Sequence, residues 1–179
     1  MRPFVPEDLA ELVDVHAEES FWWYPLRAAM TTEQTANFLQ QTIARYETDG
    51  FGIEAVTDRQ TGAMLGWAGL AVPHFLPEVL PAVEVGWRLS GPHRGRGLAT
   101  EAGRAAVDWG FSAAGLSRII SIYEPANLAS GRVMDHLGFV PCLATRNPEQ
   151  GEVLIVTEIT RETWEKQQRE SGRPSYSIE

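Results

Sequence analysis

VEVGWRLSGPHRGRGLAT, residues 83–100, is the stretch that decides the fold. Its first half alternates apolar residues at positions 83, 85, 87 and 89 with Glu84, Gly86 and Arg88, which is the period of a half-buried β-strand. Its second half is a basic, glycine-rich loop. Alanines at positions 102, 105, 106 and 113 then share one face of a helix expected from Leu98 to about Ala113. The pattern predicts a strand, a glycine loop and a helix that lies close to a sheet.

The glycine loop has the properties of an anion site. Glycine lets the backbone approach a ligand closely, and the first N–H groups of a helix have no partner inside the helix. The helix dipole is positive at that end, and Arg94 and Arg96 add charge. A phosphate-bearing ligand is therefore expected at this loop.

Two common phosphate loops do not fit these residues. A Walker loop ends in Gly-Lys-Ser/Thr, which this chain lacks. The dinucleotide fingerprint needs a third glycine where Thr100 stands, and an acidic residue about 20 positions further on, where Gly115–Arg118 is found instead.

The other segments indicate a mixed α/β chain. A helix is expected after Pro6-Glu7-Asp8, and a second opens with a capping box of Thr31 and Gln34 and closes at Gly50. Strands are expected around Ile53 and over Met64–Ala71 as a hairpin, over Ile119–Ile122, and over Val153–Ile159. A further helix runs from Asn127 to Leu137 and stops at Gly138, and a short one covers Thr160–Arg169.

Composition narrows the class of protein. The 179 residues fit a single domain, which we place at residues 1–165, followed by a polar, mobile tail at 166–179. The net charge of −9 and the single lysine, Lys166, argue against a nucleic-acid partner.

The four histidines have no ligand spacing, so no metal is expected. Cys142 allows no internal disulfide and is expected to be a half-buried structural thiol. Without a signal peptide or a long apolar run, we expect a cytoplasmic protein with no membrane partner; a homodimer is plausible.

Three motifs together resemble the GNAT family of N-acetyltransferases, in its RimJ/RimL-like branch. Arg94-x-x-Gly97-x-Ala99 is similar to the family's loop, and the strand before it ends in Trp-x-Leu, as in the family. Asn127-Leu128-Ala129-Ser130, with Leu137-Gly138-Phe139 after it, is similar to that branch's Asn-x-x-Ser helix. The resemblance extends in outline from Arg2 to Trp164.

The resemblance implies the GNAT acyl-CoA N-acyltransferase fold, a mixed, mostly antiparallel central sheet with helices on both faces. The strands around Glu84 and Ile119 would run parallel and splay apart to admit the pantetheine arm of acetyl-CoA. The residues implied to hold acetyl-CoA are Val85, Gly86, Trp87, Arg94, Gly95, Arg96, Gly97, Leu98, Ala99, Thr100, Asn127 and Ser130. A backbone N–H at a bulge in the Glu84 strand would polarise the thioester carbonyl.

Glu84 and Ser130 are the expected catalytic residues. Glu84 would accept the amine proton, directly or through water, although a solvent-facing or arginine-paired glutamate would give the same pattern. Ser130 would protonate the departing sulfur, although a serine in the first turn of a helix also bonds locally. Asn127 would serve equally as a helix cap.

The acceptor side is expected to include Trp22, Trp23, Tyr24, Phe75 and Tyr123. Ordinary core packing or a dimer contact would explain at least half of these aromatic residues. Tyr123 is also an alternative proton donor to the thiolate. The expected activity is direct transfer of an acetyl group from acetyl-CoA to a primary amine of a protein N-terminus or a small molecule. The alternatives are a non-catalytic acyl-CoA sensor and a nucleotide-binding regulator.

Two departures from the family pattern concern the ends of the domain. The chain starts almost at its first helix, so the family's first strand is expected to be short or missing. Thr157 stands about where many relatives carry an aromatic residue in the last strand.

Overall fold

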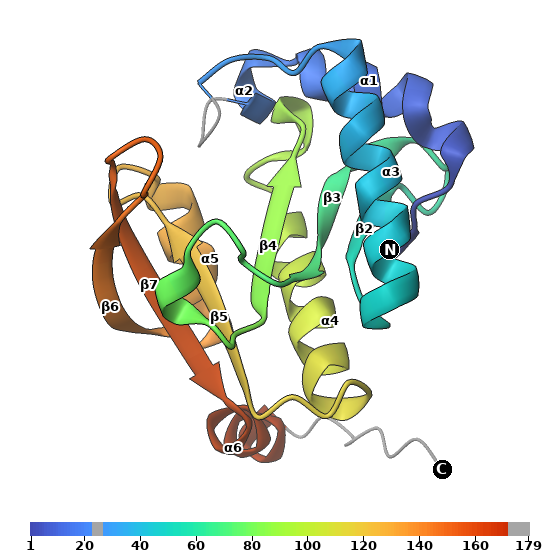
Figure 1. The fold of residues 1–179 in the computed structure, drawn as a ribbon. Helices are drawn as coiled ribbons and strands as arrows, with labels where there is room; N and C mark the ends of the chain where they lie inside the picture. The colour runs from blue at the N-terminus through green and yellow to red at the C-terminus, as the bar shows by residue number, and fades with distance from the viewer. Residues whose placement is uncertain (23–26, 172–179) are drawn as a thin grey trace. The chain divides into compact units, whose positions relative to one another are not determined.

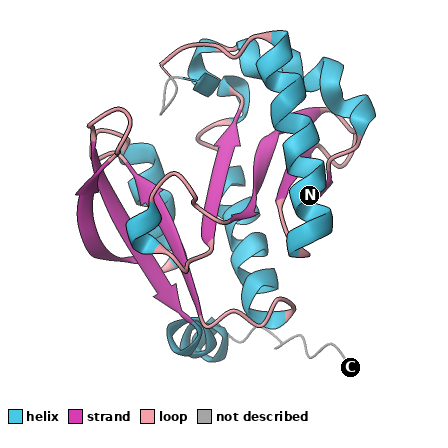
Figure 2. Ribbon diagram, viewed as in Figure 1, coloured by secondary structure: helices cyan, strands magenta, loops and turns pink. Residues whose placement is uncertain are grey.

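A computed structural model describes residues 1–22 and 27–171 of the chain, without the side chains of Ser20, Trp22 and Ser171 (Figures 1 and 2). The chain divides into two compact units. The first is built from Met1–Leu70 and Gly86–Gly103, and the second from Ala71–Val85 and the chain from Arg104 onward.

The strands form a mixed, mostly antiparallel sheet, as predicted. Its order is β1-β2-β3-β4-β5-β7-β6. The pairs β1/β2, β2/β3, β5/β7 and β6/β7 are antiparallel, whereas β4 and β5 are parallel with Glu84 opposite Ile120. The strands are β1 (Arg2–Pro3), β2 (Ile53–Thr57), β3 (Met64–Ala71), β4 (Glu84–Leu89), β5 (Arg118–Tyr123), β6 (Val140–Arg146) and β7 (Val153–Thr160).

The helices lie in the connections between these strands, except for α6, which follows β7. The α-helices are α1 (Leu9–Ala17), α2 (Glu19–Trp22), α3 (Thr32–Asp49), α4 (Leu98–Ser112), α5 (Leu128–Leu137) and α6 (Arg161–Ser171). Short 3-10 turns lie at η1 (Pro6–Asp8), η2 (Pro77–Val79) and η3 (Gly91–His93).

In the first unit, the hairpin of β2 and β3 carries a core on each face. Ala55, Met64 and Trp67 pack with residues of α1 and α3, such as Leu12 and Leu39. Their neighbours in the strands, Val56, Leu65 and Ala68, face the other way and pack with Leu98, Ala99 and Ala102 of α4. Helices therefore cover both faces of this part of the sheet, as expected.

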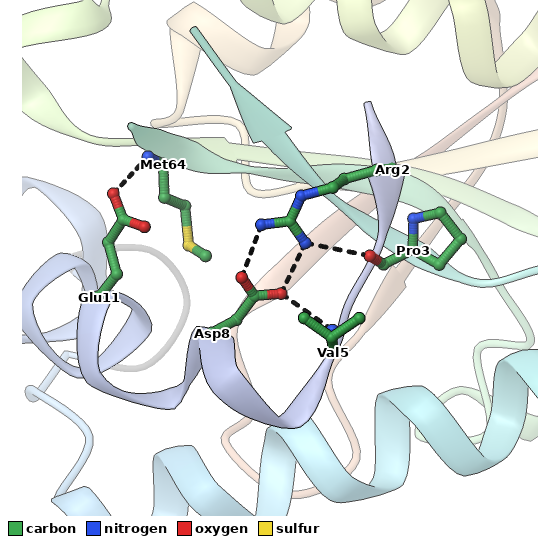
Figure 3. Close-up of polar contacts among 6 residues, drawn as sticks. All are labelled: Arg2, Pro3, Val5, Asp8, Glu11 and Met64. Carbon is green, nitrogen blue, oxygen red and sulfur yellow. Dashed lines mark hydrogen bonds and ion pairs between the residues drawn. The ribbon is translucent and has the colours of Figure 1, made fainter. Parts of the chain in front are cut away.

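The start of the chain is held by charged groups (Figure 3). The Arg2 guanidinium donates to both carboxylate oxygens of Asp8 at 2.6 and 2.7 Å, and the Val5 N–H donates to the same carboxylate at 2.9 Å. The hydrogen bond from Arg2 lowers the pKa of Asp8. Glu11 accepts from the N–H of Met64 at the start of β3. These contacts join β1 to η1 and α1 to β3, while β1 itself pairs with β2. Strand β1 is only two residues long, in agreement with the expected short first strand.

The predicted caps of α3 are confirmed. The Thr31 hydroxyl accepts from the Gln34 N–H at 3.2 Å, and the Gln34 side chain accepts from the Thr31 N–H at 2.8 Å. Gly50 closes the helix in the left-handed conformation, with φ of 74°.

The second unit centres on β5 and β7. Leu76 and Val79 pack on Ile120, Leu154 and Val156. Phe111 of α4 packs on Trp164 of α6, at 5.3 Å between ring centroids, and the Trp164 indole donates to Asp108 at 2.6 Å. The Arg161 guanidinium donates to the carbonyl oxygens of Phe111 and Leu116. These contacts fix α6 against the end of α4.

Three features differ from the sequence predictions. Strand β6 was not predicted, because Pro141 interrupts its pattern and most of its residues are exposed, leaving no alternation to read. Cys142, expected to be half-buried, is exposed, because β6 lies at the edge of the sheet. The last helix continues to Ser171, so the expected tail boundary at residue 166 falls inside α6. Within the described ranges, no helix has the length and apolar character to cross a bilayer.

Candidate active site

The glycine loop between β4 and α4 belongs to the first unit. Gly95 and Gly97 have φ of 72° and 78°, and a Cβ built on either would meet no atom within 4 Å. The glycines are therefore required by the backbone conformation and not by crowding. The Glu101 N–H donates to the Gly97 carbonyl at 2.9 Å and so starts the helical ladder. The N–H groups of Leu98, Ala99 and Thr100 precede that first bond at the positive end of the helix dipole.

The base of the loop is tied to the end of α1. Glu18, which follows α1, accepts from the Ser90 hydroxyl with both oxygens at 2.8 Å and from the Gly91 N–H at 3.0 Å. The Arg94 guanidinium donates its Nε–H to the Leu89 carbonyl at 3.0 Å, and burial lowers its pKa. His93 has a buried Nδ1 with no hydrogen-bond partner. The loop is thus anchored at its base, while Gly95, Arg96 and Gly97 are exposed.

The first unit also places Gly86 and Trp87. Trp87 packs with Leu89 against the first turn of α4, and a Cβ on Gly86 would lie 3.9 Å from the Trp67 ring. Val85 precedes them in the second unit and is fully buried.

Glu84 lies in the second unit, where β4 runs beside β5. The Ile120 N–H donates to the Val83 carbonyl at 2.9 Å, and the Ile122 N–H donates to the Glu84 carboxylate. Burial raises the pKa of Glu84 to about 8, against this hydrogen bond, which favours the charged form. Within the described part of the chain, no cation forms an ion pair with Glu84. Glu84 is therefore not an arginine-paired surface residue; it is a half-buried acid that titrates near neutral pH.

Ser121 supports the strand next to Glu84, and the sequence prediction missed it. Its buried hydroxyl donates to the Val85 carbonyl at 2.9 Å, and its own carbonyl accepts from the Thr157 hydroxyl at 3.0 Å. Thr157, expected to depart from the family pattern, is buried and has this hydrogen-bond partner in β5. The available signal was a serine flanked by isoleucines in a short apolar strand.

The first turn of α5 brings together three predicted residues. The Asn127 side chain accepts from the Ser130 N–H at 3.2 Å, so Asn127 caps the helix, as expected. The Ser130 hydroxyl is half-buried and makes no hydrogen bond to any described residue. The Tyr123 ring lies against the next residue, because a Cβ on Gly131 would be 3.2 Å from it. The structure therefore places the Tyr123 ring beside Gly131, the residue after Ser130, and leaves the serine hydroxyl available as a donor.

The predicted acceptor-side aromatics are only partly placed. Trp23 and Tyr24 lie outside the described residues, and Trp22 ends α2 with a side chain that is not described. Phe75 is exposed, with 44% of its surface accessible, whereas its neighbour Leu76 is a core residue. In residues 1–22 and 27–171, no group of three or more His, Cys, Asp or Glu side chains is arranged to hold a metal ion.

Comparison with known proteins gives a family match over most of the chain. Residues 1–140 match the model of the acetyltransferase (GNAT) domain family. Two Bacillus subtilis proteins are similar in sequence: the uncharacterized protein YkkB is 31% identical over 113 residues, and the uncharacterized N-acetyltransferase YoaA is 32% identical over 118 residues. These matches cover 63% and 65% of this chain and 63% and 64% of the relatives, so the chain spans just under two thirds of their length.

Solved structures show the same fold. The aminoglycoside acetyltransferase AAC(6')-Ib, in complex with coenzyme A, superposes with a TM-score of 0.77 at 20% sequence identity. The superposition covers 92% of this chain and 96% of that one.

Proposed function

Because the chain belongs to the acetyltransferase (GNAT) domain family, we propose that it is an N-acetyltransferase of the RimJ/RimL-like branch that transfers an acetyl group from acetyl-CoA to a primary amine. The observation that carries the proposal is Glu84, a half-buried carboxyl group with a pKa of about 8 and no cationic partner among the described residues. A group that titrates near the working pH is suited to moving protons, which a purely structural glutamate does not need.

The glycine loop fits the phosphates of coenzyme A. Its left-handed glycines and the free N–H groups at the start of α4 form a backbone site for an anion, and Arg94 and Arg96 supply charge. We assign coenzyme binding to this loop, to Val85, Gly86 and Trp87 of β4, and to Asn127 and Ser130 of α5. When bound, acetyl-CoA supplies the thioester carbonyl carbon that the amine attacks and the thiolate that leaves.

Glu84 acts as the base. In its ionised form it accepts one proton from the ammonium form of the acceptor, directly or through water, and frees the nitrogen lone pair for attack. An alkylamine has a pKa of about 10.4, so most of it is protonated at neutral pH and needs such a base. Burial supplies the carboxylate with a raised pKa, and therefore with more basicity than an exposed glutamate has.

Ser130 acts on the leaving group. As the C–N bond forms and the C–S bond breaks, its hydroxyl donates a proton to the sulfur and regains one from the second proton that the nitrogen loses. The products are an amide and the free thiol of coenzyme A, with one proton released through Glu84 to solvent. Tyr123, beside the first turn of α5, is the alternative donor.

The bulge that would expose a carbonyl-polarising N–H, and the splaying of β4 from β5, remain predictions. So does the contribution of Phe75 and of Trp22, Trp23 and Tyr24 to the acceptor side. A non-catalytic acyl-CoA sensor would share the loop but would have no use for a carboxyl group titrating near pH 8.

Thermal unfolding with and without acetyl-CoA tests the proposal first. A ligand at about 100 times its Kd adds roughly 2.7 kcal/mol of stability, a rise in Tm on the order of 5–10 °C. ATP and NAD serve as controls. A shift with acetyl-CoA alone supports the proposal, while a shift with ATP or NAD and none with acetyl-CoA contradicts it.

A further inference from the structure

Arg88, in the middle of β4, has no hydrogen-bond acceptor within residues 1–22 and 27–171. Its guanidinium lies over the Trp67 ring, with Cζ 5.0 Å from the ring centroid, and over the Phe21 ring at 5.5 Å. The side chain is half-buried. Stacking on aromatic faces offsets part of the cost of removing the cation from water, but it satisfies none of the five N–H donors. A half-buried guanidinium without an acceptor calls for an explanation.

Trp67, whose ring lies under Arg88, has a second unsatisfied donor. Its indole Nε1 is buried and has no hydrogen-bond partner. Its ring packs on Phe21, with 6.2 Å between the centroids and 76° between the planes, and on Phe38 at 5.9 Å. Aromatic neighbours thus hold the indole in place. Two side chains in contact, one cationic and one neutral, therefore have N–H groups without an acceptor among the described residues.

The surroundings of Arg88 keep this site positive. Burial lowers the pKa of Arg88 to about 10, so the guanidinium remains charged at neutral pH. The only other charged group that shifts it is Arg94, also a cation, and no carboxylate contributes. His16, in ring contact with Phe21 at 5.2 Å, is buried and has its pKa lowered to about 4, so it is neutral at pH 7. Arg88 is the charge that a ligand would meet here.

The strand pleat separates Arg88 from the helix of the glycine loop. Trp87 and Leu89, on either side of it, pack against the first turn of α4. Side chains alternate along a strand, so Arg88 emerges on the opposite face, among Phe21 of α2 and Trp67 of the first-unit core. The phosphate site proposed above lies at the start of α4. Arg88 is therefore assigned to the acceptor and not to the coenzyme.

We propose that Arg88, stacked on the Trp67 ring, binds a carboxylate of the acceptor, and that the substrate class is a small amine that carries a carboxylate group. The planar guanidinium matches the two oxygens of a carboxylate, and the hydrogen bonds formed are charge-assisted. The inference rests on the proposed acetyltransferase activity and specifies its acceptor. It also runs against the net charge of −9, which by itself would favour a cationic substrate.

Paired acceptors test the proposal. The kcat/KM for release of the coenzyme A thiol is measured for a panel of α-, β- and γ-amino acids, each beside its own carboxamide, which keeps the amine and removes the negative charge. We expect the carboxylate form of the best acceptor to exceed its amide by about 10- to 100-fold. In Arg88→Met, that ratio falls to about one, through loss of activity on the carboxylate form alone.

Two further variants and a control complete the experiment. Arg88→Lys keeps the charge but not the planar fork, so the preference is reduced without a loss of fold. Trp67→Phe keeps an aromatic face under Arg88 but a smaller one, so it lowers the preference by a smaller factor. Arg45→Gln removes an exposed charge from α3 and leaves the ratio unchanged. Because Arg88→Met removes an unpaired buried charge, its Tm without ligand should equal or exceed that of the wild type.

Several results would overturn the assignment. Equal use of the carboxylates and their amides by the wild type, or acetylation of no carboxylate-bearing amine, contradicts the assignment. So does an equal loss of kcat/KM on both forms in Arg88→Met. A weaker thermal shift with acetyl-CoA in Arg88→Met would mean that Arg88 binds the coenzyme instead. A wild type that is stabilised by acetyl-CoA but shows no carboxylate preference rejects this inference alone. Absence of any stabilisation by acetyl-CoA rejects the proposed function itself.

Discussion

Glu84 and Arg88 stand four residues apart in β4, and both are half-buried charged residues without an ion-pair partner among the described residues. Burial has opposite consequences for the charge of the two side chains at pH 7. With a pKa of about 8, Glu84 escapes the cost of burial at pH 7 by taking up a proton. Arg88, with a pKa of about 10, cannot lose its charge at pH 7. The Glu84 carboxyl can therefore gain or lose a proton near neutral pH, whereas the Arg88 guanidinium keeps its charge and is suited to binding an anion.

The largest expected effect concerns catalysis by Glu84. Glu84→Gln removes the base and should lower kcat by about 10²- to 10⁴-fold. In the wild type, kcat/KM should rise with pH and level off above about pH 8, as the carboxyl group ionises; in the variant this limb is lost. The measurement is a pH–rate profile of thiol release, with the exposed Glu165→Gln as control. Full activity in Glu84→Gln would make Glu84 a structural residue.

The same variant tests the state of the Glu84 carboxyl in the absence of substrate. Its folded pKa of about 8 lies above the ordinary value of 4.5, so between these pH values the folded protein holds a proton that the unfolded chain releases. The free energy of unfolding should therefore fall as pH rises from about 5 to 9, by at most about 4 kcal/mol from this group. Glu84→Gln should flatten the curve. Denaturant unfolding at several pH values measures this, and identical slopes in the two proteins would contradict the raised pKa.

The glycine loop offers a smaller effect with an internal control. Gly97→Ala places a Cβ on a residue with φ of 78° in open space, at a cost of about 1–2 kcal/mol from backbone strain alone. Gly62, in the turn between β2 and β3, has φ of 77° and the same open surroundings. Both alanine variants should lose similar stability without ligand, but only Gly97→Ala should also lose part of its thermal shift with acetyl-CoA. Equal rises in Tm with acetyl-CoA in the two variants would mean that the loop does not bind the coenzyme.

The smallest effect is expected at Ser121. Ser121→Ala removes the hydroxyl that donates to the Val85 carbonyl and should cost about 1 kcal/mol of stability, measured by denaturant unfolding. If this bond helps to position β4, the plateau value of kcat falls while the pH midpoint near 8 stays in place. A shifted midpoint would instead mean that Ser121 contributes to the environment of Glu84.

The local features were predictable because they depend on neighbours in the sequence. The capping box of Thr31 and Gln34, the left-handed Gly50 and Gly138, and the Asn127 cap all follow from contacts within a few residues. Strand β6 was missed for the complementary reason. It exists through pairing with β7, and its exposed residues and Pro141 give no periodic signal.

The chemical states within the candidate site could not be predicted in the same way. Sequence periodicity put Glu84 and Arg88 on the same side of a strand. It allowed two interpretations of Glu84, a catalytic base or a solvent-facing or arginine-paired residue, and predicted no role for Arg88. The choice required Ile122 from β5, which donates to Glu84 across 38 positions of sequence, and Trp67 from β3, which lies under Arg88. Likewise, Tyr123 packs on the first turn of α5 at Gly131, where a Cβ would make a tight contact of 3.2 Å with its ring.

The sequence by itself determined the family pattern, the order of strand, glycine loop and helix, and the candidate residues for phosphate binding, because these are set by period, turn chemistry and spacing. The tertiary structure alone decided that the Glu84 carboxyl has a pKa of about 8. It also decided that N–H donors of the Arg88 guanidinium and the Trp67 indole have no acceptor among the described residues. The reason is that desolvation and the supply of hydrogen-bond partners depend on atoms brought close by folding from segments distant in the chain.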